Sequence, residues 1–181
     1  MSIREDIRAY KKNDPAARSS LEVLLLYNGL HATIYYRISH WLYGHKCYFL
    51  ARMVSQHAKR RTGVEIHPAA KIGKRLVIDH GTGIVIGETT IIGDNVKMYQ
   101  GATLGALSPA GQPCDSAVRR HPKVGNNVTI YAGSTLLGGA TEIGDNVVIG
   151  GNAFLTSSVE ADTTVSIVKP EMRFRGKKSK A

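Results

Sequence analysis

The residue whose setting most favours chemistry is His80. It lies in the stretch Asp79-His-Gly-Thr-Gly83, at a point where a regular repeat of the chain is interrupted. Imidazole titrates near pH 6.5 when unperturbed, so it can take a proton from a hydroxyl group near neutrality. A turn histidine held only by hydrogen bonds is the competing interpretation, and the spacing leaves both open.

Two charged residues could act with His80. Glu65 precedes it by fifteen residues, close to the roughly eighteen of one coil of the repeat, so the two could meet on adjacent coils. A carboxylate on one imidazole nitrogen fixes the tautomer and stabilises the imidazolium. Glu65 could instead be a surface residue at a subdomain junction. Arg120, which precedes His121, could form a bidentate pair with a carboxylate or could face solvent.

From Val64 onward the chain repeats every six residues. Each hexad has an aliphatic residue, often followed by glycine, with a small or β-branched residue four positions later. Such a hexad supplies a short strand and a turn, and three hexads complete a triangular coil with the aliphatic side chain inside. The aliphatic series is Ile66, Ile72, Ile78, Ile86, Ile92, Met98, Leu104, Val124, Ile130, Leu136, Ile143, Ile149 and Leu155. The small series is Ala70, Thr82, Thr90, Val96, Ala102, Val128, Ser134, Ala140, Val147 and Ala153.

The repeat breaks at three places. Two extra residues separate Ile78 from Ile86, and one extra residue separates Leu136 from the next aliphatic position. Leu104 and Val124 are twenty residues apart, two beyond a whole coil, and the segment between them lacks the aliphatic spacing. A loop thrown out of a solenoid commonly reaches a binding face, so we expect an extruded loop over about 106–121.

The chain before the repeat has a helical period. Apolar residues recur at spacings of three and four along Leu30, Ile34, Ile38 and Trp41/Leu42, and along Leu50, Met53, Val54 and His57. Asp14-Pro15 resembles a helix N-cap followed by proline, and Gly44 and Gly63 are plausible stops. We therefore expect an α+β chain. Three or four helices occupy 1–62, a parallel β-helix 63–160 and a basic tail 161–181.

Composition narrows the class of protein. The chain has 181 residues, 43% hydrophobic and 21% charged, with no run near the roughly 18 apolar residues of a membrane span. Cys47 and Cys114 suit a reducing cytoplasm without disulfides, and the N-terminus lacks a signal-peptide core. The net charge of +10 gathers at 59–61 and in the tail, which predicts solvated ends rather than a nucleic-acid interface. Scattered lysines could also attract a polyanion such as coenzyme A.

Several stretches resemble the serine O-acetyltransferases, which are hexapeptide-repeat acyltransferases. The resemblance covers about 10–158, and the repeat alone would indicate only a hexapeptide acyltransferase. The stretches that carry it are Asp14-Pro-Ala16, His31-Ala32, Tyr36-Arg-Ile-Ser-His40, 62–73, Asp79-His-Gly-Thr-Gly-Ile-Val-Ile-Gly-Glu-Thr89, Gln100-Gly-Ala-Thr-Leu-Gly105 and Arg120-His-Pro-Lys123.

The resemblance implies a left-handed β-helix enzyme that moves acetyl from acetyl-CoA to L-serine for cysteine biosynthesis. It makes His80 the general base and Glu65 the carboxylate that orients it. It also assigns the serine and CoA contacts, and no metal is needed because a thioester is already activated. In this assignment Asp14 and Asp79 hold the serine ammonium, Arg120 its carboxylate, His121 lies beside the hydroxyl, and Gly105, Ala132 and Gly151 line a CoA channel between subunits.

The family also implies partners. A homotrimer or hexamer is expected, with L-cysteine as a feedback ligand. The family commonly has aspartate in place of Glu65, a longer helical region and a shorter loop before Arg120. Many relatives dock into O-acetylserine sulfhydrylase through a terminal isoleucine, and because this sequence ends at Ala181 we expect no such complex.

Three other readings use the same residues. A hexapeptide acetyltransferase acting on a sugar or an antibiotic would also use a loop histidine, but it has no obvious need for Asp14, Asp79 and Arg120 together. A γ-type carbonic anhydrase would bind zinc through three histidines, for which His67, His80 and His121 are the candidates. A purely structural β-helix would have little reason to break its repeat at His80.

Overall fold

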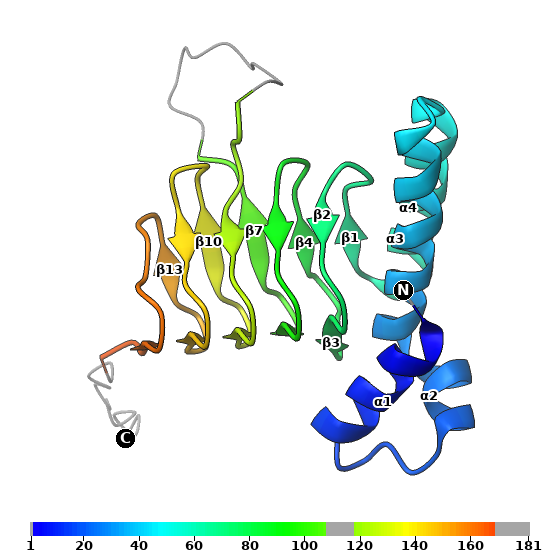
Figure 1. The fold of residues 1–181 in the computed structure, drawn as a ribbon, viewed down its shortest axis with the longest axis horizontal. Helices are drawn as coiled ribbons and strands as arrows, with labels where there is room; N and C mark the ends of the chain where they lie inside the picture. The colour runs from blue at the N-terminus through cyan, green and yellow to red at the C-terminus, as the bar shows by residue number, and fades with distance from the viewer. Residues whose placement is uncertain (1, 108–117, 169–181) are drawn as a thin grey trace, which may run out of the picture.

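The N-terminal third of the chain is helical. The computed structural model describes residues 2–107 and 118–168, and Figure 1 shows the helices at one end of a row of short strands. The helices are α1 (Ile3–Asn13), α2 (Ser20–Leu26), α3 (Asn28–Gly44) and α4 (Tyr48–Thr62). The prediction of three or four helices is confirmed.

The rest of the described chain is a solenoid with three faces, in which every strand pairs in parallel with strands of neighbouring coils. The first face holds β1 (Glu65–Ile66), β4 (Val85–Ile86), β7 (Thr103–Gly105), β10 (Thr135–Leu137) and β13 (Phe154–Leu155). The second holds β2 (Lys71–Ile72), β5 (Ile91–Ile92), β8 (Lys123–Val124) and β11 (Glu142–Ile143). The third holds β3 (Val77–Asp79), β6 (Lys97–Tyr99), β9 (Thr129–Ile130), β12 (Val148–Ile149) and β14 (Thr164–Val165). The solenoid thus reaches past the expected boundary at 160.

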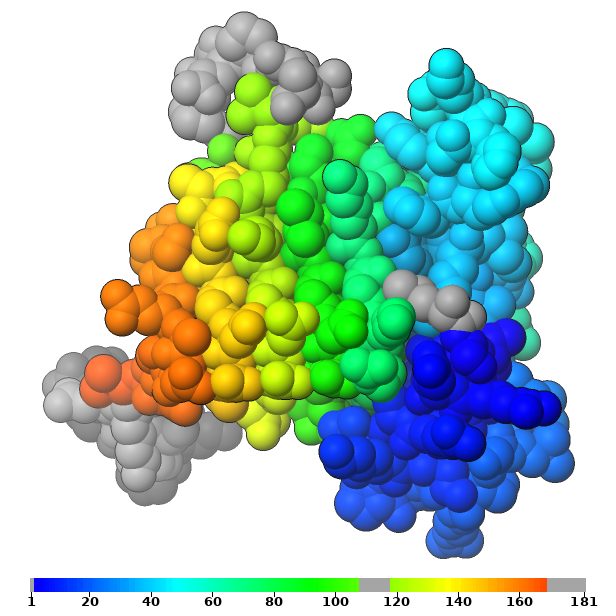
Figure 2. All heavy atoms as spheres, viewed as in Figure 1, coloured from blue at the N-terminus to red at the C-terminus, as the bar shows by residue number. Residues whose placement is uncertain are grey.

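A column of aliphatic side chains fills the solenoid. The twelve hexad positions from Ile66 to Ile149 are all buried, and they stack in register, for example Ile86 on Leu104 and Leu104 on Leu136. Burying one such side chain contributes roughly 1.5–3 kcal/mol. Figure 2 shows the coils as successive bands packed against one another.

The predicted place of the small or β-branched residue, four positions after the aliphatic one, is wrong in two coils where the repeat is broken. Thr82 and Ala140 are exposed, and Ile84 and Thr141 are buried in their place. The buried residue stands two positions before the next aliphatic residue, not four after the last one. Extra residues therefore enter before it, on the outside of the corner.

One corner of the triangle, between the third and first faces, carries a stack of left-handed residues. Gly83, Gly101, Gly133 and Asn152 have φ of +80°, +71°, +71° and +58°. Their amides donate to the previous coil, for example Gly83 N to Gly63 O at 2.9 Å. His80 and Gly81 are the two inserted residues at this corner, so we call it the histidine corner.

The start of the second helix differs from the expectation. Asp14 does not begin a helix but ends α1, with its backbone extended at ψ 107°, because the residue before a proline is disfavoured in the helical region. Its carboxylate accepts a hydrogen bond from Ala16 N at 2.8 Å. The N-cap of α2 is Ser19, whose Oγ accepts from Glu22 N at 3.0 Å.

The buried faces of the helices also differ from the apolar stripes. In α4 the buried residues are small, among them Ala51, Ser55 and Ala58, whereas Leu50 and Met53 are about half exposed. Small side chains let α4 lie close against the first coil, where Ser55 Oγ donates to Ile66 O at 2.8 Å. Gly63 caps α4 in the left-handed conformation, as expected. Gly44 is the last residue of α3 and His45 is its cap.

Gly29 and Gly44 give a matched test of the helix–solenoid contact. A Cβ at Gly29 would lie 2.1 Å from Ile78 O, whereas a Cβ at Gly44 would meet nothing within 4 Å. We expect Gly29→Ala to lower the free energy of unfolding by about 2 kcal/mol, the cost of overpacking against backbone. Gly44→Ala should be neutral or slightly stabilising, because alanine is the better helix former. Urea titration of both variants measures this, and equal stabilities would contradict the close contact.

Candidate active site

The histidine corner presents an exposed imidazole. His80 follows β3 with φ +58°, a left-handed conformation that few non-glycine residues adopt, and its side chain is 74% exposed. Gly81 continues the left-handed turn, and a Cβ there would lie 2.9 Å from Val64 and Ile78 side chains. The interruption of the repeat therefore turns His80 out of the coil. The nearest ionic partner described for it is Asp79, whose Oδ1 lies 3.9 Å from His80 Nε2.

Asp14 joins this corner from the helical subdomain. The Tyr27 hydroxyl donates to Asp14 Oδ2 at 2.7 Å, and this bond, more than the Ala16 amide, lowers the pKa of Asp14. Asp14, Tyr27, Asp79 and His80 line a cavity of about 290 Å³. The fold thus brings together three of the predicted site residues and adds Tyr27, which nothing in the spacing distinguished.

Glu65 makes other contacts. Its carboxylate accepts from Lys59 Nζ at 2.6 Å and lies 3.6 Å from Arg52 Nη2. The hydrogen bond from Lys59 is the main reason that the pKa of Glu65 is lowered. The structure therefore pairs Glu65 with α4, while Asp79 is the carboxylate beside His80.

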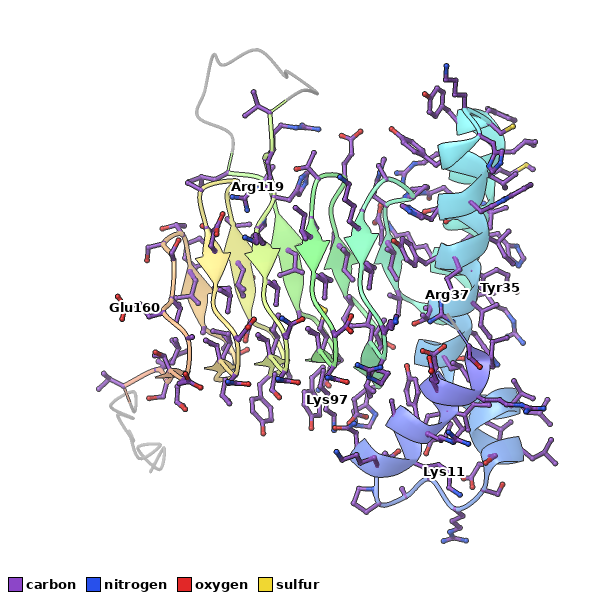
Figure 3. All side chains as sticks on the ribbon, viewed as in Figure 1. Lys11, Tyr35, Arg37, Lys97, Arg119 and Glu160 are labelled. Carbon is purple, nitrogen blue, oxygen red and sulfur yellow. The ribbon has the colours of Figure 1, made fainter. Side chains whose placement is uncertain are left out.

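A second cluster lies at the corner between the first and second faces, which we call the arginine corner. Thr89 Oγ1 accepts from Arg120 N at 2.8 Å and from His121 N at 3.0 Å, so one hydroxyl fixes both residues. Arg120 Nη2 binds Glu88 Oε2 at 2.5 Å. Figure 3 labels the neighbouring Arg119, which lies at the edge of the solenoid opposite to Lys97.

His121 is buried against the coil. Its ring lies over Gly87, where a Cβ would be 1.9 Å from the ring Cδ2, so only glycine fits there. Thr89 N donates to His121 Nδ1 at 3.2 Å, which puts the proton of the neutral ring on Nε2. Burial lowers the pKa of His121, and the positive charge of Arg120 lowers it further.

The three predicted CoA-channel residues divide between the same two corners. Ala132 and Gly151 follow β9 and β12, so they lie on the histidine corner, where a Cβ at Gly151 would be 3.3 Å from Ala132 O. Gly105 ends β7 at the arginine corner, where its carbonyl accepts from Gly138 N at 3.1 Å. Most of the segment expected to form a loop, 108–117, with Cys114, lies outside the described residues.

The two corners are separated by the whole first face. From Gly83 at one corner to Glu88 at the other, the chain crosses that face through β4, and five residue steps at the strand rise of about 3.3 Å span on the order of 15 Å. A small amino acid cannot contact Asp79 and Arg120 of one chain at once. The anionic and cationic halves must come from two copies if one ligand is to touch both.

Over residues 2–107 and 118–168, no three His, Cys, Asp or Glu side chains are close enough to hold a metal ion. None of the four helices there is long and apolar enough to cross a bilayer.

Comparison with known proteins identifies the family. No family model matches the chain. The serine acetyltransferase of Staphylococcus epidermidis strain RP62A is 51% identical over 180 residues, which cover 97% of this chain and 81% of that protein. The chain belongs to the serine acetyltransferase family.

Solved serine acetyltransferases share the fold. Isoform 3 from Entamoeba histolytica, in complex with cysteine, superposes with a TM-score of 0.88 at 36% identity over 97% of this chain. A serine acetyltransferase in complex with CoA gives 0.81 at 38% identity over 90% of this chain. The chain spans 60% and 64% of the lengths of these two proteins. The expected helical subdomain and left-handed β-helix are confirmed.

The His121 environment gives a test that needs no substrate. We expect the ring to titrate below about pH 6.5, the usual histidine value, because burial and Arg120 both disfavour the charged form. The unfolded chain then binds the proton more readily, so the free energy of unfolding should fall as the pH drops below that value. Nitrogen-15 NMR of the imidazole measures the pKa and the tautomer. A pKa above 6.5, or a proton on Nδ1, would contradict the geometry.

Proposed function

We propose that this chain is a cytoplasmic serine O-acetyltransferase, which transfers acetyl from acetyl-CoA to the hydroxyl of L-serine to give O-acetylserine and CoA. The observation that carries the proposal is the division of charge between the two corners. Asp14 and Asp79 lie on one and Arg120 on the other, which suits the ammonium and the carboxylate of a zwitterion. A neutral sugar would need neither the two carboxylates nor the guanidinium.

The proposed roles follow from this division. Asp14 and Asp79 hold the ammonium, Arg120 the carboxylate, and His121 Nε2 lies beside the hydroxyl. His80 takes the hydroxyl proton as the serine oxygen attacks the thioester carbonyl carbon. The C–S bond then breaks, and the CoA thiolate receives the proton from the His80 imidazolium. Thioesters are activated acyl donors, so these groups need no metal in this step.

We further propose that the active unit is a homotrimer, in which the histidine corner of one copy faces the arginine corner of the next. The same pairing would join Ala132 and Gly151 of one copy to Gly105 of its neighbour along one CoA channel. A cysteine complex is known for the Entamoeba relative, and we propose that L-cysteine occupies the serine site here, since it differs from serine by one atom.

Thiol release from acetyl-CoA tests the reaction and the base together. L-Serine should support release, and D-glucosamine and chloramphenicol should not. His80→Ala should lower the serine-dependent rate by about 10²–10⁴-fold, the usual contribution of a general base. The fold of each copy should be unchanged, because His80 lies outside the aliphatic column. Release that depends on a sugar instead of serine would refute the proposed substrate, and near-normal turnover by the variant would refute the base.

Glu65→Gln is the matched comparison for the orienting carboxylate. Because Glu65 binds Lys59 and Arg52, we expect its loss to be milder than that of His80. A loss deeper than that of His80→Ala would reverse the assignment of roles.

A further inference from the structure

Lys97 places an unexpected positive charge beside the carboxylates of the histidine corner. It lies on β6 at the hexad position before Met98, beside Val77 of β3, and its side chain is only 14% exposed. Its Nζ is 3.1 Å from Asp79 Oδ2, while Asp79 Oδ1 faces His80. A diagonal pair between neighbouring strands thus fixes one carboxylate oxygen and leaves the other turned toward the imidazole.

The same ammonium reaches the helical subdomain. Lys97 Nζ donates to Asn13 O at 2.9 Å, the carbonyl bonded to Asp14 N. It also lies 4.7 Å from the centroid of the Tyr99 ring. Although burial opposes it, hydrogen bonds to Tyr99 and Asp79 raise the pKa of Lys97, so the charge persists at neutral pH.

We infer that Lys97 is a positioning residue for the amino-acid substrate, which sets the spacing of Asp14 and Asp79 by binding the peptide before one and the carboxylate of the other. These two residues come from different subdomains, and a single ammonium links them. The inference rests on the proposed function for the identity of the substrate. It does not require Lys97 to touch that substrate.

Another contact keeps α1 in place without Lys97. The Tyr10 hydroxyl donates to Ile78 O at 3.3 Å and accepts from Ile78 N at 3.0 Å, which anchors α1 to β3. Removal of Lys97 should therefore loosen the Asp14 end of α1 without detaching the helix. A local effect on substrate binding is expected in place of unfolding.

The kinetic test compares Lys97→Met with Lys71→Met. Lys71 occupies the same hexad position on β2, is exposed and has no described side-chain partner. We expect Lys97→Met to raise the KM for L-serine about tenfold, with kcat and the KM for acetyl-CoA changed by less than about twofold. Lys97→Arg keeps the charge and should restore the KM for serine to within about threefold. Lys71→Met should match the wild type.

Charge alone predicts the opposite result. A cation removed from beside Asp79 would leave the corner more attractive to the serine ammonium, so a KM for serine that is unchanged or lower would overturn the inference. An equal loss in kcat/KM for L-serine and for acetyl-CoA, without rescue by arginine, would indicate general damage and would also overturn it. Should Lys97→Met not fold, the same comparison is made with Lys97→Gln, which keeps a polar side chain.

Hydrogen exchange separates this inference from the proposed function. In Lys97→Met, the amides of Asn13, Asp14 and Ala16 should exchange faster than in Lys71→Met, because the bond from Lys97 to Asn13 O is gone, while those of β9 should not change. If the wild-type protein lacked serine-dependent thiol release, the proposed function would fail, and this measurement would still decide whether Lys97 holds the two subdomains together. Unchanged exchange at these amides would refute the proposed link through Lys97.

Discussion

No strand of this solenoid can stand alone, because each is two or three residues long and its hydrogen bonds go to the coils on either side. Coils must therefore stack in register, and the aliphatic column from Ile66 to Ile149 supplies the free energy that keeps them there. A residue inserted into a coil has no place inside and must leave at a corner. Chemistry in this fold is consequently confined to the corners.

The charged groups of each corner already have partners within one copy of the chain. Asp79 is paired with Lys97, and Asp14 accepts from Tyr27. On the other side, Glu88 balances Arg120. Pairing of this kind lets ionised groups stay at a partly buried surface without a ligand present. Each corner also has groups for only one end of a zwitterion, so the proposed activity depends on contact between copies.

Much of the fold was predictable because the spacing of apolar residues along the sequence determines it. The hexads, the break at His80 and the end of the helices near residue 62 follow directly from spacing. The helix faces did not follow, since Ala51 and Ser55 are buried while Leu50 stays exposed. The position of Asp14 at the end of α1 did not follow either, because Asp-Pro can begin a helix or end one.

Long-range pairs were the hardest part of the site to foresee. Lys59 belongs to the basic run for which solvation is expected, yet it binds Glu65 across the subdomain junction. Lys97 and Tyr27 act through residues far from them in sequence, and no local pattern marks such partners. The resemblance located His80, Asp79 and Arg120, whereas the groups that hold them can be identified only in the folded structure.

The central claim is that one active site is built from two copies of the chain, and mixed assemblies test it most directly. His80→Ala and Arg120→Ala each damage a different corner, so each should be nearly inactive alone. Unfolded together and refolded as a mixture, they should recover roughly a quarter of the wild-type serine-dependent thiol release, because random pairing leaves one interface in four with both corners intact. No recovery from mixed trimers that have formed, or full activity in an isolated monomer, would contradict the account.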